Sequence, residues 1–231
     1  MAPLAVVSAR SVAWRAARAA SGPAGIRPDS RAALRWVAEQ HAVRLDVLRH
    51  VLDRRRPVSA ARTASVVDRW RAQGLVDRGR VLARTTAAVW PTAAGLRAVG
   101  LRGRPAPPPL GLLPHLHAVS LVRVAVERAG GAWTSERQLR RERTSPTAHV
   151  ADGRFRAADG VDTAVEVELT PKGASRLRDI VEELLDDHDA VLYVVEGTRV
   201  RTVVQRAVDA LDAGRRVAVC DLDWFRLHPD R

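Results

Sequence analysis

The sequence predicts an α/β protein made of two domains, and three observations carry this prediction. Residues 31–73 place apolar side chains at helical spacing, and a short hairpin pattern follows them. Between residues 149 and 222, apolar strand patterns alternate with amphipathic helical patterns, which is typical of a mixed sheet flanked by helices. The two halves also differ in charge: residues 1–110 contain 20 Arg and 6 acidic side chains, whereas residues 111–231 contain 18 basic and 20 acidic ones.

Three short helices are expected in the first domain. Apolar residues recur every three or four positions in residues 31–39, and they do so again in residues 43–51. Pro57 ends the second pattern, because proline disfavours helical geometry in the residue before it. Ser59 can then cap a third helix that runs to about Gln73.

A β-hairpin completes the first domain. Leu75 and Val76 and the apolar stretch 87–90 are the expected strands, and the polar segment 77–80 is the expected turn between them. Helices followed by a hairpin are the element order of a winged helix-turn-helix. We therefore predict a winged helix DNA-binding domain over residues 31–101, in which the third helix reads DNA.

The predicted DNA contacts lie on this third helix and on the wing. Val66, Val67 and Trp70 are expected to pack inward. The residues expected to face double-stranded DNA are Arg62, Thr63, Arg69, Arg78 and Arg80. A positive field of this size attracts polyanions, and counterion release favours nucleic acid as the partner. A role in protein contacts alone is the alternative, because winged helices also mediate such contacts.

The segments outside the two domains are expected to lack folded structure of their own. Residues 1–30 are rich in Ala and Arg with no acid before Asp29, which predicts a disordered basic arm or a start codon assigned too early. The proline-rich segment 102–110 is expected to be a stiff linker. With Cys220 as the only cysteine and no apolar stretch near 18 residues, neither a disulfide nor a membrane span is expected. We predict a cytoplasmic protein, with no preference for an oligomeric state.

The second domain, residues 111–231, is predicted to be a mixed α/β sheet. Ser135 can cap a short helix, and Asp159-Gly160 is a dipeptide typical of a hairpin turn. Helices that alternate with apolar strands predict two β-α-β crossovers. The expected elements are a buried helix at 112–129, strands at 149–157, 163–170, 190–195 and 216–222, and helices between the last three strands.

Carboxylates are concentrated on one of these strands. Strand alternation places Glu166 and Glu168 on the same face of the sheet. Two carboxylates at this spacing repel each other unless they are solvated, protonated or bridged by a cation, and oxygen-rich clusters suit Mg²⁺ or Mn²⁺. Asp152, on the preceding strand, is placed to join them across the hairpin. We therefore predict Asp152 and Glu166 as metal ligands.

Lys172 is the only lysine in a chain with 37 arginines. Pro171 keeps Thr170 extended, so Lys172 has the same parity as the two glutamates and can turn back toward them. Carboxylates together with one lysine can hold a metal, activate water and stabilise charge on a scissile phosphate. This combination predicts Glu168 and Lys172 as catalytic residues.

The residues around this centre resemble a known motif. Asp152-Gly153 with the run from Val165 to Lys172 resembles the core of PD-(D/E)XK nucleases. The whole pattern over about residues 31–222, this run included, is similar to the replication-relaxation family of plasmid and mobile-element proteins. The shared elements are Gly74-Leu-Val76, Val89-Trp-Pro-Thr92 with Gly95, Leu116-His117, Trp133 with Ser135-Glu-Arg137, and His149 with Asp152-Gly153.

The resemblance implies a winged helix fused to a PD-(D/E)XK-like domain that acts in plasmid replication and DNA relaxation. Replication or transfer proteins are then further expected partners, and Glu136 is a third candidate metal ligand by analogy with the first helix of such nucleases. The chain departs from the motif at Glu168, where the motif has lysine, and at Ala151, where it has proline. Three hypotheses follow: a DNA-nicking protein that uses Mg²⁺ or Mn²⁺, the same architecture without catalysis, and a transcriptional regulator with a sensing domain.

Overall fold

The computed structural model describes residues 30–53, 56–79, 86–103, 105–142, 148–157 and 159–226. These residues divide into two compact units, the first ending at Val124 and the second beginning at Ala125. The segment 102–110, predicted as a linker, therefore lies within the first unit. Residues 1–29 of the predicted basic arm lie outside the described residues.

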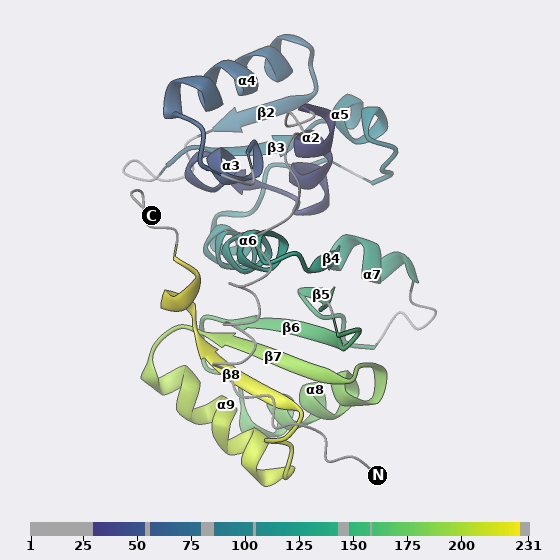
Figure 1. Cartoon of the computed structure of the whole chain (residues 1–231), viewed down its shortest axis with the longest axis vertical. Helices are drawn as coiled ribbons and strands as arrows, with labels where there is room; N and C mark the ends of the chain where they lie inside the picture. Colours follow the sequence, from purple (N-terminus) through teal and green to yellow (C-terminus); the bar gives the residue numbers. More distant parts are fainter. Residues whose placement is uncertain are drawn as a thin grey trace. The chain divides into compact units, whose positions relative to one another are not determined.

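The first unit combines short helices with a small antiparallel sheet (Figure 1). Its helical elements are α2 (Ser30–Glu39), α3 (Leu45–Val51), α4 (Ala60–Ala72), α5 (Ala93–Ala98), the 3-10 turn η1 (Leu110–Leu112) and most of α6 (Leu113–Arg128). Its strands are β1 (Val43–Arg44), β2 (Val76–Gly79) and β3 (Ala88–Pro91), arranged in the order β1-β3-β2. The three predicted helices and the hairpin are confirmed.

Local chemistry explains where α4 begins and how it packs. The Ser59 hydroxyl accepts a hydrogen bond from the backbone N–H of Arg62 and so caps the helix. Val66, Val67 and Trp70 are buried, as predicted. The helix thus buries one stripe, and the side chains on its other face remain available to solvent.

Two details of the hairpin differ from the prediction. Residues 43 and 44 form β1 before α3 begins, and Asp77 to Gly79 belong to β2 instead of a turn. β2 is an edge strand, so its outer backbone groups face solvent and polar residues can extend it without burial. Asp77, Arg78 and Gly79 therefore continue the strand.

A buried ion pair joins α2 to α6 within the first unit. One Nη of Arg123 lies 2.8 Å from a carboxylate oxygen of Glu39, and both side chains are more than nine-tenths buried. The other carboxylate oxygen of Glu39 accepts from Arg35, and the Arg123 guanidinium lies 4.5 Å from the centre of the Trp36 ring. Removing one partner of such a pair would leave a buried charge uncompensated.

Helix α6 differs from the expectation that the chain has no apolar segment long enough to cross a membrane. Residues 110–128 are the one described segment long and apolar enough to cross a membrane by length and composition. The helix is nevertheless buried along much of its length, and it carries the buried Arg123. These features are those of a core helix, and they are compatible with a soluble protein.

The second unit contains a five-stranded mixed sheet (Figure 1). Its strands, in spatial order, are β4 (Ala132–Ser135), β5 (Gly153–Arg156), β6 (Asp162–Glu168), β7 (Ala190–Val195) and β8 (Val217–Asp221). Its helices are α7 (Glu136–Glu142), α8 (Ala174–Asp187), α9 (Thr198–Ala210) and the 3-10 helix η2 (Leu222–Phe225). Strands β4 to β6 are antiparallel, whereas β6, β7 and β8 are parallel, which confirms the two predicted crossovers.

Helices α8 and α9 cover one face of the parallel strands (Figure 1). Their apolar stripes pack against side chains that alternate along β7 and β8, including Val191, Tyr193 and Val219. Cys220 is a free, buried thiol on β8, and burial raises its pKa to about 11. The face of the sheet that carries this core is also the face that carries the candidate site.

Gly95 is required by a close approach of the backbone. A Cβ at this position of α5 would lie 1.9 Å from the carbonyl oxygen of Leu75, a backbone atom that cannot swing away. We expect Gly95→Ala to lower the free energy of unfolding of the first unit by about 1–3 kcal/mol. Gly111→Ala, where a Cβ meets open space, is the matched control. Urea unfolding followed by tryptophan fluorescence measures the stability of both variants. Equal unfolding midpoints for the two variants would contradict the close approach of Gly95 to the Leu75 carbonyl.

Candidate functional site

The pairing of β6 with β7 places two glutamates beneath α8. Glu166 lies beside Tyr193 and Glu168 beside Val195 in the parallel register, so all four side chains share one face of the sheet. Glu166 is 3% exposed and Glu168 is 4% exposed. The predicted shared face is therefore confirmed, but the two carboxylates are buried and not solvated.

Asp152 joins this face from the residue before β5, because the strand begins at Gly153 and not at residue 149 as predicted. One of its carboxylate oxygens accepts a hydrogen bond of 2.8 Å from the backbone N–H of Val167 on β6. The next residue must be glycine, because a Cβ on Gly153 would lie 2.0 Å from the Trp133 ring. The Trp133 ring thus packs against Gly153. Asp152 contacts β6 across the hairpin, as predicted.

His149 is the residue to which sequence reasoning assigned no role. Its Nε2 lies 2.7 Å from Oε1 of Glu166, and its backbone N–H donates to Glu183 on α8. The segment that carries His149 is therefore held between α8 and β6. The signals in the sequence were its place three residues before Asp152 and its presence among the residues that carried the family resemblance.

Lys172 turns back toward the glutamates, as predicted. Its Nζ lies 2.6 Å from Oε2 of Glu168, which makes a close ion pair, although the alignment is not that of a hydrogen bond. The Lys172 side chain is 38% exposed, whereas that of Glu168 is 5% exposed. The ammonium group thus connects a buried carboxylate to the protein surface.

Burial sets the electrostatics of Glu166. The pKa of Glu166 is raised from 4.5 to about 7: burial makes the largest contribution and the nearby carboxylate of Asp152 adds to it, whereas His149 and Lys172 act in the opposite direction. Near neutral pH this carboxyl group is therefore poised between its two protonation states. A bound cation would shift that balance toward the ionised form.

Tyr193 adds a buried hydroxyl to the same face. The side chain is completely buried, and its hydroxyl has no hydrogen-bond partner among the described residues. Burial raises the pKa of this phenol, and the charges of Glu166, Glu168 and Asp152 raise it further. The hydroxyl is consequently protonated over the whole physiological pH range.

The third predicted metal ligand has a different partner. Glu136, at the start of α7, makes an ion pair of 2.5 Å with Arg140 one turn later. Within the described ranges, no group of three or more His, Cys, Asp or Glu side chains is arranged to hold a metal ion. The structure thus brings together Asp152, Glu166, Glu168 and Lys172, and it gives Glu136 a contact along its own helix.

The outer face of α4 carries two of the predicted DNA contacts. Arg62 and Arg69 are exposed on this face. Thr63 was wrongly predicted to face outward: it is 1% exposed, and its hydroxyl donates to the carbonyl oxygen of Ser59. Thr63 precedes Val66 by three residues and Val67 by four, which places it on the buried stripe.

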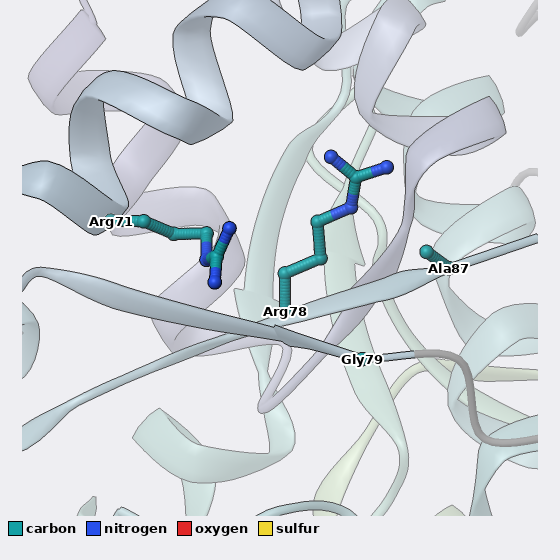
Figure 2. Close-up of a pocket in the computed structure, with 4 residues that line it drawn as sticks. All are labelled: Arg71, Arg78, Gly79 and Ala87. Atoms are coloured by element: carbon teal, nitrogen blue, oxygen red, sulfur yellow. The ribbon is translucent and has the colours of Figure 1, made fainter.

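Arginines line a shallow pocket near the end of α4. This pocket, of about 220 Å³, is lined by Arg71 of α4, Arg78 and Gly79 of β2, and Ala87. Figure 2 shows the side chains of Arg71 and Arg78 between the helix and the strand. Both guanidinium groups lie within 4 Å of Asp68, so one carboxylate is shared by two cations. Arg80 lies outside the described residues.

A second shallow pocket lies at the other end of the same helix. Its volume is about 310 Å³, and it is lined by Asp53, Arg56, Pro57, Val58, Ser59 and Arg62. Helix N-termini favour anions because their first N–H groups are not used within the helix. Arginine side chains thus line one pocket near each end of the 13-residue helix α4.

Comparisons of the chain with protein-family models, curated proteins and solved structures found no match. The geometry of the two units is therefore the basis on which function is inferred.

The elevated pKa of Glu166 predicts how stability depends on pH. The pKa is about 7 in the folded chain and 4.5 for an unperturbed glutamate, so the folded state binds more protons between these values. This contribution to stability is complete below pH 4.5 and is lost as the pH rises through 7. In EDTA we expect the wild type to lose on the order of 2–3 kcal/mol through this group between pH 4.5 and 8.

Glu166→Gln provides the comparison, because an amide cannot ionise at this position. The difference in unfolding free energy between wild type and variant, from urea titrations at each pH, should follow the titration of Glu166. Two parallel pH profiles would show that Glu166 is ionised throughout.

Proposed function

We propose that the chain is a DNA-binding protein of plasmid or mobile-element replication and DNA relaxation, whose second unit nicks DNA with a divalent cation. The observation that carries the proposal is a buried Glu166 beside Asp152, next to the ion pair of Glu168 with Lys172. A buried carboxylate whose pKa lies near 7, in a group with a cationic side chain, is typical of a functional site.

The first unit supports the DNA-binding part of this proposal. Helix α4 is followed directly by the antiparallel pair β2 and β3, the order that a winged helix requires. Arg62 and Arg69 lie on its exposed face, and Arg56 and Arg71 line pockets near its ends. Such arginines bind phosphate oxygens and fix the position of a helix on a duplex.

The donor atoms of the second unit fit a hard divalent cation. Asp152 and Glu166 offer carboxylate oxygens, and the energetic cost of burying two negative charges falls when a cation joins them. Mg²⁺ in phosphoryl chemistry is commonly held by one or two carboxylates, with water and substrate phosphate as further ligands. Asp152 and Glu166 would therefore hold Mg²⁺ or Mn²⁺, which when bound supplies Lewis-acid activation of a phosphodiester and of water.

The other residues have separate tasks in this proposal. Lys172, whose ammonium reaches the surface, stabilises negative charge on the scissile phosphate. Glu168 orients that ammonium through the 2.6 Å ion pair. His149 contacts Oε1 of Glu166 and so limits the rotation of this carboxylate.

A second function, DNA binding without catalysis, is favoured by a different observation. His149 already contacts Glu166, and Lys172 already neutralises Glu168, so the charges can be balanced by the protein itself. In this case the second unit would recruit replication or transfer proteins, and the cluster would stabilise β6.

A nicking assay on supercoiled plasmid separates these two functions. With Mg²⁺, the wild type should convert supercoiled DNA to open circles, and Lys172→Ala and Glu166→Ala should each be slower by about 100-fold or more. Arg178→Ala, on the exposed side of α8, serves as a control for a change of charge near the site. Lys172→Arg tests whether a guanidinium can replace the compact ammonium.

The outcome of this assay decides between the two functions proposed for the second unit. Unchanged nicking by both Lys172→Ala and Glu166→Ala would exclude the proposed centre. A wild type that binds plasmid but does not nick it would favour the accessory role.

The DNA interface is tested by salt dependence. Replacing Arg62 and Arg69 together by glutamine in the full chain should weaken duplex binding, and it should reduce the slope of log affinity against log salt by about 2. The matched control is the double glutamine variant of Arg199 and Arg206, two exposed arginines on α9. Fluorescence anisotropy with labelled duplex measures both. A larger loss of duplex affinity in the control variant would show that the DNA interface lies on the second unit.

A further inference from the structure

The chain has a single tyrosine, and it lies at the centre of the candidate site. Tyr193 occupies the middle of β7, is completely buried and lies beside Glu166 in the sheet register. Buried tyrosine hydroxyls ordinarily have a hydrogen-bond partner, because an unpartnered one loses its hydration without compensation. This hydroxyl has none among the residues that the structure describes. Its isolation needs a chemical reason.

The hydroxyl belongs to the face of the sheet that carries the carboxylates. Tyr193 pairs with Glu166 in the register of β6 and β7, and Glu168 shares that face. The charges of Glu166, Glu168 and Asp152 raise the pKa of the phenol beyond the effect of burial. A protonated phenol is a hydrogen-bond donor, and ionised carboxylates are acceptors. The Tyr193 hydroxyl is therefore a donor placed among acceptors.

The carboxylates nevertheless use other partners in this structure. Oε1 of Glu166 contacts His149, one oxygen of Asp152 accepts from Val167, and Oε2 of Glu168 lies against Lys172. A cation held by Asp152 and Glu166 would keep the Glu166 carboxylate ionised, and an ionised carboxylate is a stronger acceptor for a neighbouring hydroxyl.

We propose that Tyr193 is a positioning residue of the cation centre, whose hydroxyl donates a hydrogen bond to the Glu166 carboxylate when a divalent cation is bound. This inference rests on the cation centre of the proposed function and adds a residue to it. The phenol ring is fixed in the core formed with α8 and α9, so the donor approaches from a rigid strand. A partner that orients a metal-binding carboxylate typically contributes 10- to 100-fold to metal affinity.

The proposal makes opposite predictions for the metal-free and the loaded protein. Tyr193→Phe keeps the ring in the core and removes only the hydroxyl. Without metal, the variant loses an unpartnered buried group, so its melting temperature should rise by a few degrees. With metal, it loses the donor to Glu166, so its affinity for Mn²⁺ should fall about 10- to 100-fold. A purely structural role would not produce this reversal.

The single tyrosine also provides a direct spectroscopic test. When tyrosine is labelled with ¹³C at Cζ, the full-length protein gives one signal, which responds to hydrogen bonding of its own hydroxyl. Titration with Mg²⁺ should shift this signal in the wild type until it saturates. The same titration should leave the signal unmoved in Glu166→Gln. Mn²⁺ binding, followed by electron paramagnetic resonance, measures the affinity of wild type and Tyr193→Phe.

The outcomes distinguish this inference from the function on which it rests. Mn²⁺ binding that depends on Glu166, together with an unmoved tyrosine signal and equal affinity in Tyr193→Phe, would overturn the role of Tyr193 and leave the cation centre intact. A wild type that binds no Mn²⁺ would overturn both. A saturable shift together with weakened binding in Tyr193→Phe supports both.

Discussion

The organisation of the second unit depends on one constraint: β6 carries two carboxylates on the face that α8 covers. Burying Glu166 and Glu168 is costly, and the surrounding residues offset that cost with His149, with Lys172 and with a proton on Glu166. His149 lies before β5, Lys172 lies after β6, and the proton comes from solvent. The carboxylates therefore determine how the loops around β6 must fold back.

The sequence was sufficient to predict the parts of the fold that follow from periodicity. Strand β7 was predicted with its observed ends, because six consecutive apolar residues leave little freedom in a parallel sheet. Strand β4 was missed, because its four residues are mostly half-exposed and show no alternation of apolar side chains. Helix α5 was missed as well, because its short apolar pattern depends on Gly95 packing against Leu75, a contact that periodicity does not reveal.

The candidate site also has features that periodicity predicted and features that it did not predict. Parity along β6 was enough to place Glu166 and Glu168 together, because side chains alternate strictly along a strand. Lys172 lies beyond the end of β6 and reaches Glu168 from the segment that follows the strand. Parity could not predict that the carboxylates would be buried, since burial depends on which face α8 covers. For the same reason the roles of His149 and Tyr193 could not be inferred, as both reach Glu166 only through tertiary packing.

Glu166 is therefore a side chain for which several partners compete. His149 contacts one of its oxygens, Asp152 disfavours its charge, and Tyr193 lies beside it with a hydroxyl that has no hydrogen-bond partner in the described part of the chain. If stability alone had shaped this strand, apolar residues at 166 and 168 would pack at lower cost, because a buried ionic group is often less stable than a hydrophobic replacement. Two buried acids beside a buried hydroxyl therefore lower the stability of the sheet, and the proposed cation would offset part of that cost.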